Sequence, residues 1–371
     1  MTWLCNWKAF LFVPNFILFV GFSLHSSVFA EVLLPVGCPK AHCSQDNRDW
    51  AYVPAPSQNS KIVWHRNLLP GEKAGSGIGL GCSGNGHIAV CTFQNIRSHS
   101  NVIAYDYDGA RLWDSRNLLG PEVVASAPMI LANGDVIIAD SKKVIRFSGD
   151  GSVAWSTPLP FGGTTLSPVL TDDRVLILAT KSGPVYALDS ITGQMLAHHF
   201  ILQSPADAGY FETQNTPAIK GNRVFIITQH QIGGSLDPNK IGWLVAIDVD
   251  RDAPNEEDRL KVAWHFEVGT ESRSSPIVTG DVVLFESSRA NAGTDDEDPH
   301  VFAVTNGATE ATEIWRKRLT SPAFASFLLD PRPETSFWHF ALASPTWTRR
   351  SVETGDIIET INRQGSDRLL R

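Results

Sequence analysis

The hydrophobic positions of the chain form short strands that return in a fixed order. Four segments each run from a Ser-Pro, Thr-Pro or Ala-Pro step through an apolar strand and a two-residue polar turn into a second apolar strand. The turns have β-hairpin chemistry: they are Asn133-Gly134, Asp172-Asp173, Gly221-Asn222 and Gly280-Asp281. Second strands such as VIIAD, VLILAT and VFIIT are continuous β-branched runs, which indicates strands covered on both faces. No segment after residue 30 has a sustained helical period with caps, so the pattern predicts an all-β protein with almost no helix.

A second hairpin follows each of these segments and ends at a tryptophan or at a residue in its place. In four units a turn glycine lies four residues before that final position: Gly109 and Trp113, Gly151 and Trp155, Gly193 and Ala197, Gly355 and Glu359. Four short strands in each step of roughly 40 to 50 residues are the signature of a β-propeller blade. The sequence therefore predicts a β-propeller of four-stranded blades with about six recognisable repeats. A β-sandwich is the structural alternative.

Each recurring residue type has a mechanical role in such a blade. Asp106, Asp189 and Asp248 end strands, where a short carboxylate can accept hydrogen bonds from the amides of the following turn. The turn glycines supply the positive φ that closes a hairpin. The tryptophans end outer strands, where an indole ring can wedge between adjacent blades and its N–H can find an acceptor. We therefore interpret all of these residues as structural.

The number of blades stays open from the sequence. Six units run from His65 to about Asn362, yet the strand that ends at Trp64 resembles the outer strand of a further blade without its inner strands. The ring either closes with six blades or is an incomplete seven- or eight-bladed propeller. The last unit is degenerate, with Glu359 where tryptophan is expected, which favours the incomplete ring.

Residues 1–30 have the order of parts of a secretory signal peptide. We expect cleavage after Ala30 and a periplasmic or secreted protein. Pro14 and Gly21 interrupt the apolar stretch, which argues against a bilayer span of roughly 20 apolar residues. An uncleaved anchor and lipidation at Cys38 are the alternatives. The expected organisation is a leader (1–30), an N-terminal extension with Cys38 and Cys43 (31–60), propeller repeats (61–362) and a C-terminal tail (363–371).

Four cysteines follow the leader, an even number in a chain bound for an oxidising compartment. The simplest of three possible connectivities joins Cys38 to Cys43 and Cys82 to Cys91. A turn at Asn85-Gly86 would put Cys82 opposite Ala89, so the second disulfide needs a register shift or a bulge. Zinc is the other use of four cysteines, but the chain has no CxxC pair.

The segment VYALDSITGQMLA carries the motif of a known family. Its Ala187, Asp189, Thr192 and Gly193 resemble the Ala-x-Asp-x-x-Thr-Gly-x-x-x-Trp docking motif of the pyrroloquinoline-quinone-repeat (PQQ-like) β-propellers. YDYDGARLW, which ends at Trp113, is a relative that is one residue shorter. The resemblance covers roughly residues 64–362 and implies a propeller fold. The family includes quinoprotein dehydrogenases, the lipoprotein of the outer-membrane β-barrel assembly machinery, and extracytoplasmic sensor or adaptor domains.

The chain departs from the quinoprotein dehydrogenases of that family. They are typically longer, and many carry an adjacent cysteine pair over the quinone, whereas no two cysteines here are neighbours. No cluster of Glu, Asn and Asp aligns with their calcium ligands. We therefore expect no bound cofactor and name no catalytic, cofactor-binding or metal-binding residue. The expected function is an exported, non-enzymatic binding or scaffold module that presents its face loops to a protein or other ligand. A small quinoprotein dehydrogenase and an outer-membrane protein assembly factor are the alternatives.

Three aspartates alternate in the insertion DVDRDAPNEEDRLK, as they do in a calcium loop. The sixth position is Ala253 rather than Gly, and the twelfth is Arg259 rather than the bidentate Glu. We therefore expect a solvated acidic loop. This insertion and RANAGTDDEDPH lie in the units that end at Trp264 and Trp315, and long loops on a rigid scaffold are where binding usually resides.

Other candidate chemistry in the sequence has simpler interpretations. His198 and His199 are adjacent, so in a strand they point to opposite faces and cannot chelate one ion together. The glycine-rich GSGIGLGCSGNG lacks the following helix and Lys-Ser/Thr of a phosphate loop. No GxSxG nucleophile motif is present. The formal net charge of −8 disfavours nucleic acid and anionic membrane surfaces as partners.

Overall fold

The chain divides into two units, residues 1–30 and 31–371, and the structure described here belongs to the second. The computed structural model describes residues 37–49, 78–93, 101–116, 118–120, 126–163, 165–181, 184–200, 210–213, 215–232, 235–236, 242–269, 272, 274–287, 299–320, 326–330, 334–340 and 346–362.

The described strands form six antiparallel sheets of consecutive strands, called blades 1 to 6 in chain order. Blade 1 contains β1 (Ile78–Gly84), β2 (Ile88–Phe93), β3 (Val102–Asp106) and β4 (Arg111–Asp114). Blade 2 contains β5 (Met129–Ile130), β6 (Val136–Ala139), β7 (Lys143–Phe147) and β8 (Val153–Pro158). Blade 3 contains β9 (Val169–Leu170), β10 (Val175–Ala179), β11 (Val185–Asp189) and β12 (Met195–His199).

Blade 4 contains β13 (Tyr210–Glu212), β14 (Ala218–Lys220), β15 (Arg223–Ile232), β16 (Ser235–Leu236), β17 (Gly242–Val249) and β18 (Leu260–Gly269). Blade 5 contains β19 (Ile277–Thr279), β20 (Val282–Ser287), β21 (His300–Thr305) and β22 (Glu313–Arg318). Blade 6 contains β23 (Leu328–Leu329), β24 (Ser336–Phe340), β25 (Thr346–Ser351) and β26 (Ile357–Asn362). Blade 4 is larger because the long β15 also pairs with β13 and β16.

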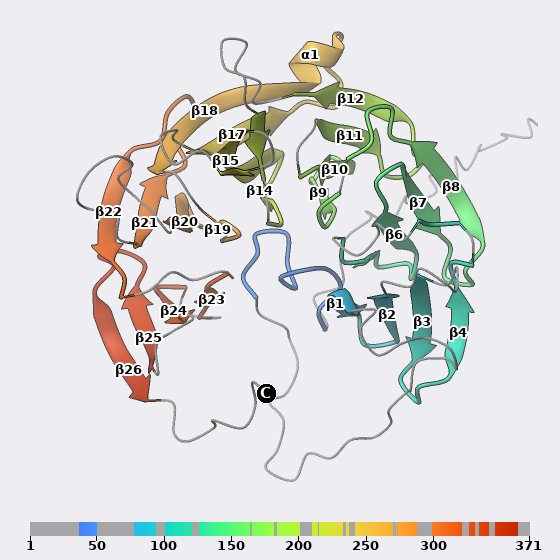
Figure 1. Cartoon of the computed structure of the whole chain (residues 1–371), viewed down its shortest axis with the longest axis horizontal. Coiled ribbons are helices and arrows are strands. Elements are labelled where there is room, and N and C mark those ends of the chain that lie inside the picture. Colours follow the sequence, from blue (N-terminus) through green and yellow to red (C-terminus); the bar gives the residue numbers. More distant parts are fainter. Residues whose placement is uncertain are drawn as a thin grey trace, which may run out of the picture. The chain divides into compact units, whose positions relative to one another are not determined.

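The predicted all-β propeller fold is confirmed. One short helix, α1 (Glu256–Arg259), interrupts the described strands, and the inner strands of successive sheets face a common centre (Figure 1). Among the described residues, no helix has both the length and the apolar character needed to cross a membrane.

Five hydrophobic clusters hold the blades together, one between each consecutive pair. We call the face of a blade that packs on the next blade its forward face. Between blades 1 and 2, for example, Ala104 and Trp113 on the forward face of blade 1 pack with Ile138 and Phe147 of blade 2. The continuous β-branched strands are explained by this arrangement, because the central strands of a blade are buried on both faces.

The tryptophans of the repeat lie between blades as the sequence predicts. Trp113, Trp155, Trp264 and Trp315 each donate the indole N–H to a carbonyl of the following blade, at 3.1, 3.1, 3.0 and 2.9 Å. The acceptors are the carbonyls of Gly149, Ser190, Gly307 and Val352. Burial of the ring and a satisfied N–H together fix the spacing of neighbouring blades.

The strand-ending aspartates follow the prediction in two of three cases. Asp106 Oδ1 accepts the amide of Ala110 at 2.7 Å, and Asp189 Oδ1 accepts the amide of Thr192 at 2.7 Å. The prediction is wrong for Asp248, which forms an ion pair with Arg223 at 2.6 Å. The turn begins two residues later, at Asp250, whose Oδ1 accepts the amide of Asp252 at 3.0 Å.

The simplest disulfide connectivity is confirmed: Cys38 is bonded to Cys43, and Cys82 to Cys91. The predicted register around the second bond is wrong, because Cys82 lies directly opposite Cys91 and Gly84 opposite Ala89. The turn is longer than two residues. Asn85 Oδ1 accepts the amides of His87 and Ile88 at 3.1 and 3.2 Å, and this side-chain turn places the two cysteines side by side.

Candidate functional site

A polar segment before the first blade runs through the centre of the sheets. We call residues 37–49 the hub strap, and Figure 1 shows it, in blue, surrounded by the inner strands. The strap accepts a hydrogen bond from a main-chain amide of each of the six blades. Each inner strand donates an amide N–H to it, and the donors are Gly84, Ile130, Leu170, Ile219, Val278 and Leu329.

The acceptors on the strap are almost all main-chain carbonyls. Cys38 O, Pro39 O, Gln45 O, Asp46 O and Arg48 O accept at 2.8, 2.7, 2.8, 3.1 and 3.2 Å. For blade 3 the acceptor is the side-chain oxygen Gln45 Oε1, 3.1 Å from the amide of Leu170. The inner edge of a sheet exposes unpaired amides, and buried amides need acceptors. The strap therefore supplies acceptors that the repeats themselves do not contain.

The strap folds tightly enough to reach six strands with 13 residues, 37–49. The Cys38–Cys43 disulfide closes a short loop, within which the Cys43 amide donates to Lys40 O at 3.1 Å. His42, Cys43, Asn47 and Asp49 have φ of 60°, 60°, 60° and 53°. A left-handed backbone is costly for residues other than glycine, so four such residues in one segment require strong support from their surroundings.

Two buried polar side chains supply part of that support. Lys40 is 1% exposed, and its ammonium donates to Ala41 O, Ser44 O and Asn47 Oδ1 at 2.6, 2.6 and 3.1 Å. The three N–H bonds of the ammonium thus have three acceptors. Burial lowers the pKa of Lys40 to about 7, although Asp46 and Asp49 favour the charged form.

Asn47 joins the strap to two blades. Its side chain is fully buried, and Nδ2 donates to Thr216 O, Pro217 O and Pro276 O at 3.0, 3.1 and 3.0 Å. The first two carbonyls precede β14 of blade 4, and the third precedes β19 of blade 5. One side chain therefore fixes the spacing of these two blades at the hub.

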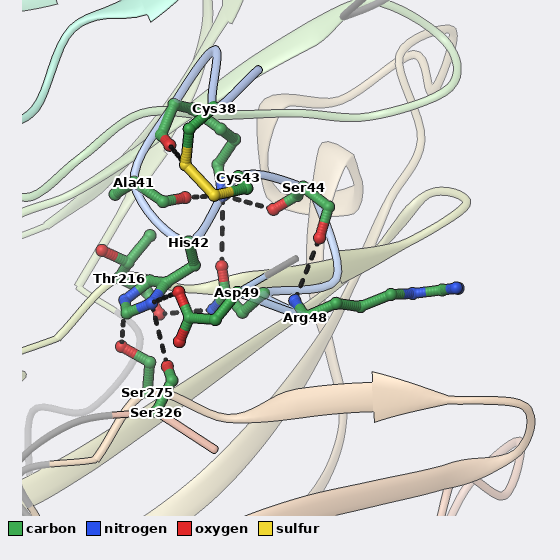
Figure 2. A network of polar contacts seen from close by, with 12 residues as sticks. Cys38, Ala41, His42, Cys43, Ser44, Arg48, Asp49, Thr216, Ser275 and Ser326 are labelled. Atoms are coloured by element: carbon green, nitrogen blue, oxygen red, sulfur yellow. Dashed lines mark hydrogen bonds and ion pairs between the residues drawn. A yellow bond between two sulfur atoms is a disulfide. The ribbon is translucent and has the colours of Figure 1, made fainter. Parts of the chain in front are cut away.

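His42 performs the same task for blades 5 and 6 (Figure 2). Its Nε2 lies 2.9 Å from Ser275 Oγ, and its Nδ1 lies 2.8 Å from Asp49 Oδ1 and 3.0 Å from Ser326 Oγ. The order serine, imidazole, carboxylate is that of an activated nucleophile. However, Ser275 is 1% exposed and holds the pre-proline position of the repeat.

The same position in blade 3 has a structural role, since Ser167 Oγ accepts the amide of Ala127 at 3.0 Å. We therefore assign the His42 network to holding the strap rather than to a reaction.

A polar cavity of about 310 Å³ opens beside the strap. It is lined by strap residues and by the hairpin turns of blades 3, 4 and 5: Gln45, Asp46, Arg48, Asp172, Ile219, Lys220, Gly221, Val278 and Gly280. Its cations already have partners. Arg48 pairs with Asp46 and Glu334, and Lys220 pairs with Asp281 at 2.8 Å. The cavity thus offers polar groups but no uncompensated charge from these two cations.

A second, larger hollow lies where blade 4 meets blade 5. This aromatic groove, of about 510 Å³, is lined by Trp243, His265, Phe266, Glu267, Phe302, Glu313 and Arg316. Trp243 and His265 meet edge to face with ring centroids 4.5 Å apart. The Arg316 guanidinium lies 5.4 Å from the centre of the Phe302 ring and binds the Glu313 carboxylate at 3.0 and 3.1 Å. Rings and a guanidinium on one surface are typical of protein-binding hot spots.

The groove belongs to the two blades whose insertions were predicted to bind a partner. The insertion of blade 4 folds as the end of β17, α1 and the start of β18. Most of RANAGTDDEDPH in blade 5 lies outside the described residues.

The aspartates of the candidate calcium loop do not converge. Asp248 pairs with Arg223, Asp250 accepts the amide of Asp252, and Glu256 pairs with His198 at 2.8 Å. In the described part of the chain, no three His, Cys, Asp or Glu side chains come together as a metal site requires. The other member of the histidine pair, His199, is exposed.

The sequence pattern does not predict the hub strap, which lies within the expected N-terminal extension. Its residues CPKAHCSQDNRD show no strand or helix period. The available signal was indirect. Short apolar inner strands after each proline need acceptors on their free edge, and a polar, disulfide-closed segment can supply them.

Comparisons with known proteins agree with this fold. A family model described as outer membrane protein assembly factor BamB matches residues 51–309, more than half of the chain. No curated protein sequence matches. This match confirms the resemblance to the PQQ-like repeat family.

Three solved structures illustrate the likeness. Quinohemoprotein alcohol dehydrogenase ADHIIG from Pseudomonas putida HK5 is 12% identical with a TM-score of 0.53, over 89% of this chain and 48% of that one. The quinohemoprotein alcohol dehydrogenase from Comamonas testosteroni is 11% identical with a TM-score of 0.50, over 88% of this chain and 73% of that one. BamB from Moraxella catarrhalis is 18% identical with a TM-score of 0.48, over 76% of this chain and 72% of that one. At these identities the likeness to the two alcohol dehydrogenases shows the fold alone.

The described residues do not fit the quinone and calcium of the dehydrogenases. No three His, Cys, Asp or Glu side chains of the described residues come together as a calcium site requires. The cysteines of this chain form two disulfides, each between residues that are not neighbours in the sequence. We derive no chemistry through either group.

Proposed function

This chain belongs to the protein family described as outer membrane protein assembly factor BamB, and from this premise we propose that it is an exported, non-enzymatic propeller that binds protein partners during outer-membrane protein assembly. The single observation that best supports the proposal is that the hub strap occupies the centre of the sheets (Figure 1). The inner-strand amides bind the strap, so the surfaces left for a partner are the turns, the rims and the grooves between blades.

Of these surfaces, the aromatic groove between blades 4 and 5 has the composition of a protein-binding site. Phe266, Phe302 and Arg316 lie on its walls, and aromatic and arginine side chains dominate the energetics of protein interfaces. The occupant that we propose is a segment of an outer-membrane protein or of its assembly partner, with an apolar side chain inserted between the rings. The carboxylate of Glu313 holds Arg316 in place for that contact.

Export fits the same picture. The leader-like residues 1–30 and the two disulfides both suit an oxidising compartment outside the cytoplasm. Location in the periplasm would place the groove within reach of proteins on their way to the outer membrane.

The test is photo-crosslinking in native cell envelopes, with the full chain carrying p-benzoylphenylalanine at one position. His265 is exposed within the groove, and Phe161, which follows β8 and lies outside the groove, is 55% exposed. We expect an outer-membrane protein or assembly component to be captured from position 265 and not from position 161. Equal capture at the two positions would contradict the groove. Oxidation of alcohols or sugars by the purified chain with added quinone and calcium would overturn the non-enzymatic function itself.

A further inference from the structure

The insertion of blade 4 covers the outer edge of blade 3. Figure 1 shows α1 on the outer side of β12, and the two elements are in contact. Glu256 Oε1 accepts the main-chain amide of His198 at 3.0 Å. The Arg259 guanidinium donates to Leu196 O at 2.8 Å. A strand added to the edge of a sheet would supply the same acceptor and the same donor, so the two side chains take the place of a pairing strand.

The insertion is anchored at its two ends, whereas α1 depends on β12 for its position. Before α1, Arg251 forms an ion pair with Asp189 of blade 3. After α1, the buried Leu260 packs in the hydrophobic cluster between blades 3 and 4. The four residues of α1 include no buried side chain, and its N-cap makes no side-chain hydrogen bond to the helix. So short a helix does not persist alone, so its contacts with β12 hold it in place.

β12 lacks the residues that protect the other outer strands from pairing with another chain. Charged side chains and proline discourage strand addition at the edge of a sheet. Asp, Glu, Lys or Arg occurs in β4, β18, β22 and β26, and β8 ends at Pro158. Of the six outer strands that the structure describes, only β12 has neither a proline nor one of these charged residues. The insertion therefore covers the edge that has no protection in its own sequence.

We propose that this insertion is an autoinhibitory contact, which prevents a second copy of the chain from adding its own β12 to the outer edge of blade 3. When α1 is displaced, the β12 strands of two copies can pair antiparallel about a two-fold axis, so that the same edge serves both partners. No Asp, Glu, Lys or Arg of β12 opposes that pairing. With α1 in place, its side chains occupy the amide of His198 and the carbonyl of Leu196, and the edge is closed to a second strand.

The test compares self-association of the full chain with and without the two edge contacts, by light scattering over a wide range of concentration. Glu256→Ala/Arg259→Ala removes both contacts, and we expect self-association on the order of tenfold stronger than that of wild type. Glu257→Ala/Lys261→Ala is the matched control, because it removes one acidic and one basic group from exposed side chains of the same insertion. It should match wild type. Circular dichroism verifies the fold of each variant, and Glu256→Ala alone should give a smaller increase if the double variant does not fold.

A proline on β12 tests whether this strand is the surface that pairs. His198→Pro, added to Glu256→Ala/Arg259→Ala, removes the outer-edge amide, and the edge of a sheet tolerates proline where the missing N–H faces outward. Self-association should then return to the wild-type value. The proposal is overturned if loss of the edge contacts leaves self-association unchanged, or if the control variant associates equally strongly. Association that persists with proline at position 198 would assign the contact to another surface and would overturn it as well.

Discussion

The indole of Trp113 lies against the turn glycine Gly151 of the following blade, so closely that a Cβ on Gly151 would come within 2.5 Å of the Trp113 Cγ. Trp155 has the same relation to Gly193, and Trp315 to Gly355, with 2.6 Å in both cases. This contact between consecutive blades explains why each repeat keeps its glycine and its tryptophan at a constant spacing. The glycine of one blade makes room for the tryptophan of the blade before it.

Substitution of Gly151 by alanine should therefore destabilise the protein more than an ordinary turn glycine would. Gly151 and Gly134 have φ of 84° and 87°, but a Cβ on Gly134 would meet no atom within 4 Å. Gly134→Ala should cost about 1 kcal/mol through backbone strain alone. Gly151→Ala should cost roughly 3 kcal/mol or more, because the ring must also move. Urea unfolding of both variants checks this, and equal midpoints would contradict the contact.

Replacement of Trp264 separates ring packing from hydrogen bonding. Trp264→Phe keeps most of the ring but loses the N–H that binds Gly307 O, so we expect a loss of about 1 to 2 kcal/mol. Trp264→Ala should lose about 3 to 5 kcal/mol. Trp347, which is 40% exposed, provides the control, and Trp347→Phe should change the unfolding free energy little. Equal losses for Phe and Ala at position 264 would show that the ring contributes no packing.

The blade architecture could be predicted from sequence because it depends on local signals. Hairpin turns, β-branched runs and the glycine–tryptophan spacing each act within one repeat, and every blade repeats them. The two wrong predictions concern positions where one side chain forms a contact that the repeat pattern does not contain. Asn85 lengthened a turn that looked like two residues, and Arg223 took the carboxylate of Asp248.

The hub strap could not be found in the same way. Its contacts join residues 37–49 to strands as far along the chain as Leu329, and no period in the sequence records them. Asn47, for example, binds carbonyls 169, 170 and 229 residues away. The need for an acceptor at each inner strand is visible in the repeats, but the segment that meets it is fixed only by tertiary structure.

Loss of Asn47 should show how much the strap contributes to stability. Asn47→Ala removes the donor to three buried carbonyls and the acceptor for Lys40, and it leaves alanine at a φ of 60°. We expect a loss of roughly 3 kcal/mol or more. Asn222→Ala is the control, because its side chain binds Asp173 at an exposed turn and should contribute less than about 1 kcal/mol. The chemical-denaturation midpoints of the two variants should thus differ clearly. Similar midpoints would mean that the side chain of Asn47 contributes little to stability.

The buried Lys40 should give the stability of the protein a pH dependence at alkaline pH. Its pKa is lowered by burial from 10.5 to about 7 in the folded protein, so between these values the unfolded chain binds the proton that the folded chain has released. Stability then rises with pH across this window, by about 1 kcal/mol per pH unit from this group. Below pH 7 both states are protonated, and the penalty of the buried charge is constant.

Lys40→Met should remove that rise. The variant leaves Ala41 O, Ser44 O and Asn47 Oδ1 without their lysine donor, so it is expected to be less stable at any single pH. The slope between pH 7 and 10, rather than the absolute value, is therefore the quantity to compare. Unfolding free energies measured at several pH values for wild type and variant give the difference, in which all other titrating groups cancel. Parallel curves would mean that the ammonium keeps its proton in the hub. In that case its three hydrogen bonds, together with Asp46 and Asp49, outweigh the cost of burial.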